Sequence, residues 1–77
     1  MIKIKYFAAA KETAGKEEEV LKQKKMTVQQ LLDWIEQAYP EFKGMSLQVA
    51  VNEEYARRED TIHSGDVCAL IPPVSGG

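Results

Sequence analysis

The chain ends in a run of six residues that could support chemistry without a reactive side chain: Pro72-Pro73-Val74-Ser75-Gly76-Gly77. A free carboxylate at Gly77 is a poor electrophile, because resonance makes its carbon less electrophilic and its negative charge repels nucleophiles. It becomes reactive once another protein turns one of its oxygens into a leaving group. The Gly77 carboxylate is therefore the candidate reactive group, and any acid or base would have to come from partner proteins.

The residue types in this run suit a tail that enters a narrow channel. Pro72-Pro73 would stiffen the root of the tail and aim it away from the folded part. Gly76 and Gly77 have no Cβ, so they fit a narrow space and adopt the backbone angles it requires. We therefore expect a domain at residues 1–71 and a tail at residues 72–77, which spans at most roughly 20 Å when extended. Taken alone, a terminal Gly-Gly would be an inert chain end.

Side chains that usually perform catalysis are sparse. The single cysteine, Cys68, lies in the apolar run Val67–Ile71, where a free cysteine packs as a small hydrophobe. The alternative, a nucleophilic Cys68, has no base beside it in the sequence. His63 is expected on a surface turn. The glutamates at 17–19 and 53–54 lack the spacing of a calcium loop and are expected to be solvated, so we predict no bound metal or permanent cofactor.

Composition limits the classes of function. A chain of 77 residues leaves little room for an internal active site, because so small a domain buries only about 60% of the surface of its unfolded chain. The formal net charge is −2 and no basic stripe is present, which argues against a nucleic-acid partner. Lysines interrupt residues 1–5, so we expect neither a signal peptide nor a membrane span in this stretch. One cysteine cannot form an internal disulfide, and we predict a cytoplasmic protein.

The N-terminal third shows two strand patterns and a helical turn between them. Residues 2–7 alternate with a period of two, which predicts a strand with Phe7 on its lysine-bearing face. Residues 8–15 favour a helical turn that ends at Gly15. Residues 17–22 predict a weaker strand at a sheet edge, where charge is tolerated.

The clearest element is an amphipathic helix that begins after Thr27. Thr27 and Gln30 match a capping box, and Pro40 ends the helix. One face of this helix is expected to be apolar: Val28, Leu31, Leu32, Ile35, Ala38 and Tyr39.

The remaining chain predicts three strands. Residues 47–52 alternate, residues 55–56 form a short return strand, and residues 67–71, apolar on both faces, form a central strand. Ile62 is expected to enter the core from a polar loop. One helix covering one face of a mixed sheet of about five strands makes a two-layer α+β domain.

With this order and ending, the chain resembles the ubiquitin-like β-grasp proteins, and more narrowly the small subunit of molybdopterin synthase. The resemblance covers nearly the whole chain, and the terminal run is its most specific part. Lys11 departs from the family pattern, which often has arginine; the positive charge is kept but a bidentate contact is lost. The matching runs are Tyr6-Phe7-Ala8 with Lys11-Glu12 and Gly15, Ser64-Gly65-Asp66, and Ile71 to Gly77.

The resemblance implies a sulfur-carrier cycle. An activating enzyme adenylates the Gly77 carboxylate with ATP, and sulfur from a donor protein displaces AMP to leave a thiocarboxylate. The tail then enters the large subunit of the synthase, expected in a heterotetramer, and donates sulfur to precursor Z in molybdopterin biosynthesis. On this view the chain is the sulfur-donating subunit of a sulfurtransferase and has no catalytic side chain of its own.

A carrier without a pocket must be recognised through its surface. We therefore expect Phe7 and Leu70 to form an exposed apolar patch, continued by Pro72, Pro73, Val74 and Ser75; the alternative is that Phe7 and Leu70 are core residues. Two other functions stay open. One is a sibling carrier for thiamine thiazole or another sulfur acceptor, and the other is a ubiquitin-like binding module with an inert terminus.

Overall fold

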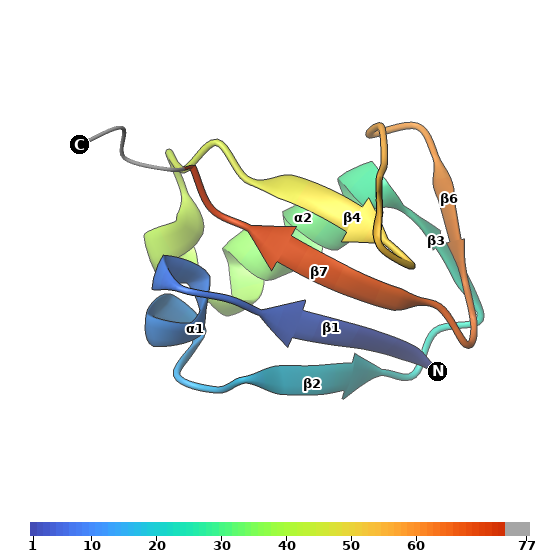
Figure 1. Cartoon of the computed structure of the whole chain (residues 1–77), viewed down its shortest axis with the longest axis horizontal. Coiled ribbons are helices and arrows are strands. Elements are labelled where there is room, and N and C mark those ends of the chain that lie inside the picture. Colours follow the sequence, from blue (N-terminus) through green and yellow to red (C-terminus); the bar gives the residue numbers. More distant parts are fainter. Residues whose placement is uncertain (74–77) are drawn as a thin grey trace.

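The alternating residues at the start of the chain form β1, the second strand of a mixed five-stranded sheet. The computed structural model describes residues 1–73. Parallel pairing joins β1 to β7 at the centre, and every other neighbour in this sheet is antiparallel. The spatial order of the strands, shown in Figure 1, is β2 (Glu18–Leu21), β1 (Ile2–Tyr6), β7 (Val67–Ile71), β4 (Gln48–Val51) and β5 (Glu54–Tyr55).

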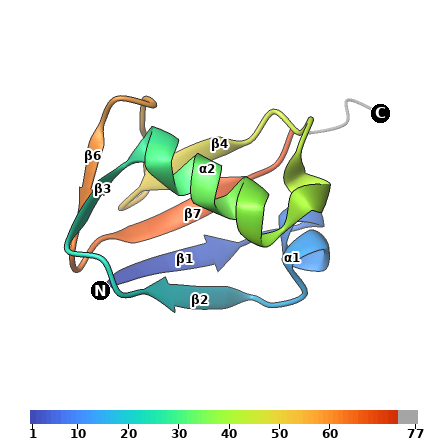
Figure 2. The ribbon, with the colours of Figure 1, turned by 180° about the vertical axis from the view of Figure 1, so that it is seen from behind.

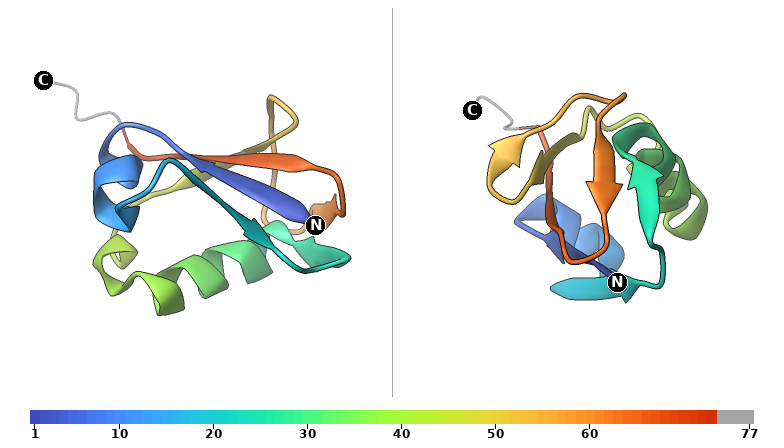
Figure 3. Two further views of the ribbon diagram at one scale, coloured as in Figure 1. Left: turned by 90° about the horizontal axis from the view of Figure 1, so that it is seen from below. Right: turned by 90° about the vertical axis from the view of Figure 1, so that its right-hand side faces the viewer.

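One main helix, α2 (Val28–Ala38), covers one face of this sheet (Figures 2 and 3). The predicted capping box is confirmed: Thr27 Oγ1 accepts from the Gln30 amide at 3.1 Å, and Gln30 Oε1 accepts from the Thr27 amide at 2.9 Å. Pro40 ends the helix and opens the short 3₁₀ helix η1 (Pro40–Phe42). Ala38 is exposed rather than buried, because it falls at the margin of the apolar stripe in the last turn. The predicted two-layer arrangement is confirmed.

The core lies between α2 and the sheet. The helix contributes Val28, Leu31, Leu32 and Ile35, all buried. Alternation in each strand turns a matching row toward them. The sheet and its connections contribute Ile2, Ile4, Tyr6, Phe42, Val49, Ile62, Cys68 and Leu70.

A second, two-stranded sheet was missed in the sequence. It pairs β3 (Lys25–Thr27) with β6 (Thr61–His63), and Met26 lies opposite Ile62. Ile62 is fully buried as predicted, but it lies in a strand and not in a loop. Each strand has only three residues with a single apolar one in the middle, so neither is long enough to show a period of two.

The short helix α1 (Ala9–Ala14) confirms the predicted helical turn, and Gly15 ends it with φ 76°. Because β1 and β7 are parallel, they end at the same side of the molecule, which is also where α1 lies (Figure 1). Phe7 after β1 and Pro72 after β7 therefore emerge side by side. Within residues 1–73, no helix is long and apolar enough to cross a membrane.

Candidate functional site

The face of the five-stranded sheet that points away from α2 is here named the open face. Strand register fixes its members, because residues paired across neighbouring strands point to the same side. Lys3 pairs with Val20 and Val67, and Ala69 pairs with Lys5 and Ala50. The open face consists of Glu18, Val20, Lys3, Lys5, Val67, Ala69, Ile71, Gln48, Ala50 and Tyr55.

Phe7 stands at the corner of the open face, where β1 ends, and is 51% exposed. The prediction that Leu70 shares an exposed patch with it is wrong, since Leu70 is 0% exposed. Leu70 pairs with the buried residues Tyr6 and Val49, so its side chain points at α2. Its place beside Phe7 is taken by Ile71, which is half-buried on the open face.

The sequence reasoning also missed Tyr55, which is 71% exposed on the edge strand β5. Tyr55 pairs with Ala50 and therefore lies on the open face. Together with Val67, Ala69 and Ile71 it extends the apolar surface from Phe7 across the sheet. Once Cys68 is known to be buried, alternation assigns Val67, Ala69 and Ile71 to this face. The sequence alone does not show it, because a strand that is apolar throughout gives no signal of which face is covered.

The open face carries a shallow hollow of about 530 Å³ between β1 and the β4–β5 turn. Val67 and Ala69 of β7 form part of its lining, with Lys5 and Phe7 on one side. Asn52 and Glu53 line it on the other side. A surface of this kind, apolar in the middle and charged at its margins, is typical of a protein-protein contact.

The backbone turns sharply directly after Phe7. Ala8 has φ 50° and ψ −126°, a conformation that L-residues rarely adopt and that stores strain. The turn is held because the Phe7 carbonyl accepts from the Ala10 amide at 2.9 Å, and the Ala8 carbonyl accepts from Lys11 at 3.0 Å. Phe7 thus stands on a fixed corner. Lys11 further pairs with Glu17 at 2.8 Å, so the lysine at this position makes an ion pair.

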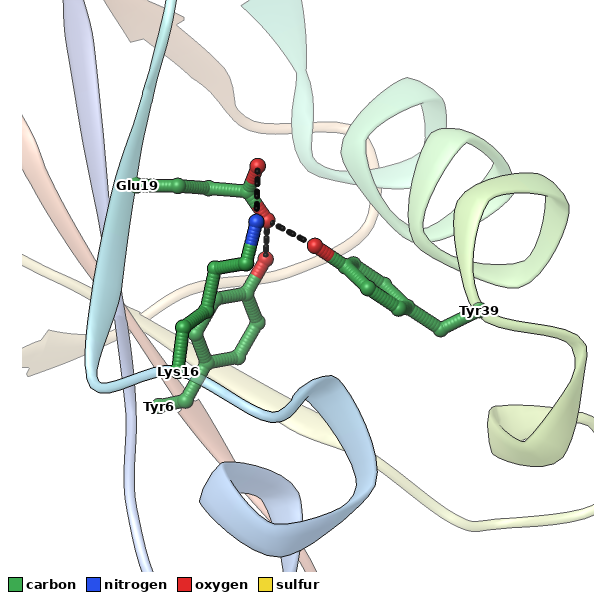
Figure 4. Close-up of polar contacts among 4 residues, drawn as sticks. All are labelled: Tyr6, Lys16, Glu19 and Tyr39. Atoms are coloured by element: carbon green, nitrogen blue, oxygen red, sulfur yellow. Dashed lines mark hydrogen bonds and ion pairs between the residues drawn. The ribbon is translucent and has the colours of Figure 1, made fainter.

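On the helix side of the sheet, at the end of α2, one carboxylate is surrounded by polar partners (Figure 4). Glu19 of β2 accepts hydrogen bonds from the hydroxyls of Tyr6 and Tyr39, the latter at 2.6 Å, and Lys16 lies 3.6 Å away. Burial alone would raise the pKa of Glu19, but the bonds from Tyr39 and Tyr6 and the charge of Lys16 outweigh it, so that this pKa is lowered. Burial and the Glu19 carboxylate raise the pKa of Tyr6. The prediction that Glu19 is merely solvated is wrong.

Cys68 is fully buried on the core face of β7. Burial, assisted by the negative charge of Asp66, raises the pKa of the Cys68 thiol to about 11. The thiol is therefore protonated at neutral pH, and a protonated, buried thiol is a poor nucleophile. Cys68 packs as a small hydrophobe, as expected. His63 is exposed at the end of β6, and no cluster of three metal-ligating side chains occurs in residues 1–73.

The root of the tail leaves β7 at the Phe7 corner. Pro72 is half-buried and Pro73 is exposed. The candidate reactive residues Gly76 and Gly77, and the candidate contact residues Val74 and Ser75, lie outside the described residues.

Comparison with known proteins gives consistent matches along the whole chain. Curated relatives that are 34–40% identical carry the name molybdopterin synthase sulfur carrier subunit. The one from Aspergillus niger is 40% identical over 81 residues, which cover 96% of this chain and 91% of the relative.

Solved structures share the fold. A Pyrococcus furiosus protein named for subunit 1 of molybdopterin converting factor has a TM-score of 0.84 and 28% identity, covering 95% of this chain and 97% of that one. SAMP1 from Haloferax volcanii has a TM-score of 0.80 and 31% identity, covering 99% and 98%. The family model described as ThiS family matches residues 4–77, and the chain therefore belongs to the ThiS family.

Proposed function

We propose that this chain is the sulfur carrier subunit of molybdopterin synthase. The observation that carries the proposal is the identity of 34–40% to relatives of that name. The family match runs through residue 77 and so includes the Pro-Pro-Val-Ser-Gly-Gly tail. The exposed corner where residues 72–77 begin, and the fold of residues 1–71, suit a rigid domain that presents a tail to other proteins. The cytoplasm is its predicted location.

The proposed cycle uses the Gly77 carboxylate and no side chain of this protein. An oxygen of that carboxylate attacks the α-phosphorus of ATP in the activating enzyme, and pyrophosphate leaves. A sulfide supplied by the sulfur donor then attacks the carbonyl carbon, AMP leaves with the bonding electrons, and a thiocarboxylate remains. The thiocarboxylate is ionised and nucleophilic at sulfur. Within the large subunit it gives its sulfur to precursor Z.

We further propose that the open face docks on the large subunit. Phe7, Ile71 and Tyr55 are its bulky apolar side chains, and the tail starts beside Phe7 and Ile71. A partner that covers this face also receives the tail, with Pro72 and Pro73 at the boundary and residues 74–77 entering the channel. Lys11, paired with Glu17, lies near this corner.

The test is removal of the terminal glycines. Deleting Gly77, or Gly76 and Gly77, shortens the reach of the carboxylate by about 3.3 Å per residue, far more than reaction geometry tolerates. The truncated chains should unfold at the temperature of the wild type, since the last residues of a domain generally add little to its stability. Intact-mass spectrometry is the measurement, after incubation with activating enzyme, ATP and sulfur donor. Wild type should gain the mass difference of one oxygen exchanged for sulfur, and the truncated chains nothing.

Replacing Gly76 by valine separates the steric effect from the effect of tail length, because it keeps the length and adds only a β-branched side chain. It should also lose the sulfur gain, for the steric reason alone. A sulfur gain on a truncated chain, or none on wild type with its verified activating enzyme, would refute the carrier proposal. Purified large subunit with precursor Z then decides the acceptor, because a carrier for thiamine thiazole would gain sulfur but not yield molybdopterin.

A second candidate is protein modification. Haloferax volcanii SAMP1, whose name stands for small archaeal modifier protein 1, is 31% identical with a TM-score of 0.80. The same activated Gly77 carboxylate, attacked by a lysine amine and not by sulfide, would form an amide with another protein. Peptide mass spectrometry of cell extracts tests this by searching for lysines that carry the C-terminal residues of this chain.

A further inference from the structure

The turn between β4 and β5 contains a residue that its backbone does not favour. Val51 pairs with Glu54, so the loop has two residues, Asn52 and Glu53. Their φ angles are 50° and 71°. A two-residue hairpin turn with both φ values positive is type I′, and its second position strongly prefers glycine. Glu53 occupies that position.

Asn52 is well suited to its place. Asparagine tolerates the left-handed region. Its side-chain carbonyl accepts from the Val67 amide at 3.0 Å, and its side-chain amide donates to Asp66 at 3.0 Å. Asn52 thereby ties this turn to the start of β7. Glu53 makes no side-chain hydrogen bond or ion pair with any residue in the 1–73 region, so the fold itself gains nothing visible from a glutamate there.

Glu53 lines the hollow on the open face, and Lys5 lines the other side of it. Lys5 is likewise without an ion pair among the described residues. Glu18, which lies opposite Lys5 on β2, pairs instead with Lys3 at 3.9 Å, and Lys11 pairs with Glu17 at 2.8 Å. Opposite charges thus stand on either side of an apolar floor, and each lacks a partner within residues 1–73.

We propose that Glu53 and Lys5 are specificity-determining residues that orient the docking partner on the open face. The partner surface they fit has an apolar centre, a lysine or arginine opposite Glu53, and a carboxylate opposite Lys5. Docking in the reversed orientation would bring like charges together, which disfavours it. The inference rests on the proposed function, because the partner to which it commits is the large subunit of the synthase.

The variant that separates this role from a structural one is Glu53→Gly. Glycine suits the second position of a type I′ turn, so the variant should melt about 3–6 °C higher than wild type. Its association rate with purified large subunit should nevertheless fall, by about three- to tenfold near 0.01 M salt. A gain in stability together with a loss in association rate is not expected of a residue that only shapes the turn.

Two further variants isolate the charge. Glu53→Gln keeps the size of the side chain, so its association rate should fall as in Glu53→Gly and approach that of wild type near 1 M salt, where charges are screened within about 3 Å. Glu54→Gln is the matched control, since Glu54 pairs with Val51 and points to the other face of the sheet. It removes an equal charge one residue away and should bind at the wild-type rate. Lys5→Gln should behave as Glu53→Gln does.

Association rates are measured by surface plasmon resonance at several salt concentrations, with the large subunit immobilised. A Glu53→Gln variant that associates like wild type near 0.01 M salt would overturn the inference, as would equal slowing by Glu54→Gln. A wild type that does not bind the large subunit contradicts the proposed docking and this inference together. A wild type that binds as described but never gains sulfur contradicts only the carrier chemistry.

Discussion

The two faces of β7 have nearly the same composition but different surroundings. Cys68 and Leu70 point at α2 and are 0% exposed, whereas Val67, Ala69 and Ile71 point away and are only half-buried. A sheet in the middle of a domain is usually covered on both faces when its central strand is apolar throughout. This domain has one main helix and covers one face. The apolar residues on the other face are therefore available to a partner.

Glutamates on the two faces of the sheet also differ in how many partners they have. Glu19 reaches the helix side of the sheet, where tyrosine hydroxyls and Lys16 satisfy it. Glu53 lines the hollow on the open face and has no partner within the described residues. A carboxylate with several protein partners serves the fold, and an unpartnered one in a strained turn is better explained by recognition.

The largest difference between the faces should appear on truncating neighbouring residues of β7. Leu70→Ala leaves a cavity in the core and should lower the free energy of unfolding by about 2–5 kcal/mol. Ile71→Ala removes a side chain of the same size from the half-exposed face and should cost about 1 kcal/mol. Urea denaturation measures both. Equal losses would mean that the open face is as closely packed as the core, and would refute the comparison.

Affinity for the large subunit should depend on the open face more than on the core. Phe7→Ala should leave the free energy of unfolding almost unchanged and weaken binding to the large subunit by about 2 kcal/mol, as expected of an exposed aromatic anchor. Titration calorimetry gives the affinity. Val20→Ala should weaken binding less, because Val20 is also exposed on the open face but lies on the edge strand β2, outside the hollow. Unchanged affinity for a folded Phe7→Ala protein would remove Phe7 from the docking surface.

Elements whose apolar pattern repeats over five or more neighbouring residues could be predicted from the sequence. The helix after Thr27 has a capping box and a repeating apolar stripe, and both are found in the structure. The strands at 2–6 and 67–71 alternate or are continuously apolar over five residues each. Alternation along residues 2–7 predicts that Phe7 points to the same side as Lys3 and Lys5, which is the exposed side.

The errors come from features that depend on packing between distant segments. Leu70 could not be assigned to a face, because its neighbours are apolar as well and the register with β1 decides. Glu19 reads as one of a run of acidic residues, and only the folded chain brings Tyr6 and Tyr39 to it. The pair β3 and β6 forms between segments that are too short to show a pattern. A turn between the strands at 47–52 and 55–56 could be expected, but not its backbone angles, since glutamate is unusual where φ is positive.

Acid should weaken the helix side of the sheet through Glu19. Its pKa is lowered in the folded state, so its contribution to stability is present above the unfolded value of about 4.3 and is lost as the pH falls through the folded value. Glu19→Gln should cost about 1.5 kcal/mol at neutral pH and flatten the acid limb of the stability curve. Urea denaturation from neutral pH downward measures both effects. A Glu19→Gln variant that keeps the acid limb of the wild type would refute this role of Glu19.

The smallest effect is expected for Cys68→Ala, which tests whether the buried face of β7 has any chemical role. The thiol is fully buried and its pKa is raised to about 11, so almost none is present as the nucleophilic thiolate at neutral pH. Alanine removes only the sulfur atom and should lower the free energy of unfolding by about 1 kcal/mol. The variant should gain sulfur at its C-terminus as fast as wild type, measured by intact-mass spectrometry over time. A folded Cys68→Ala protein that fails to gain sulfur would make Cys68 a relay in the transfer, and the core face could no longer be regarded as purely structural.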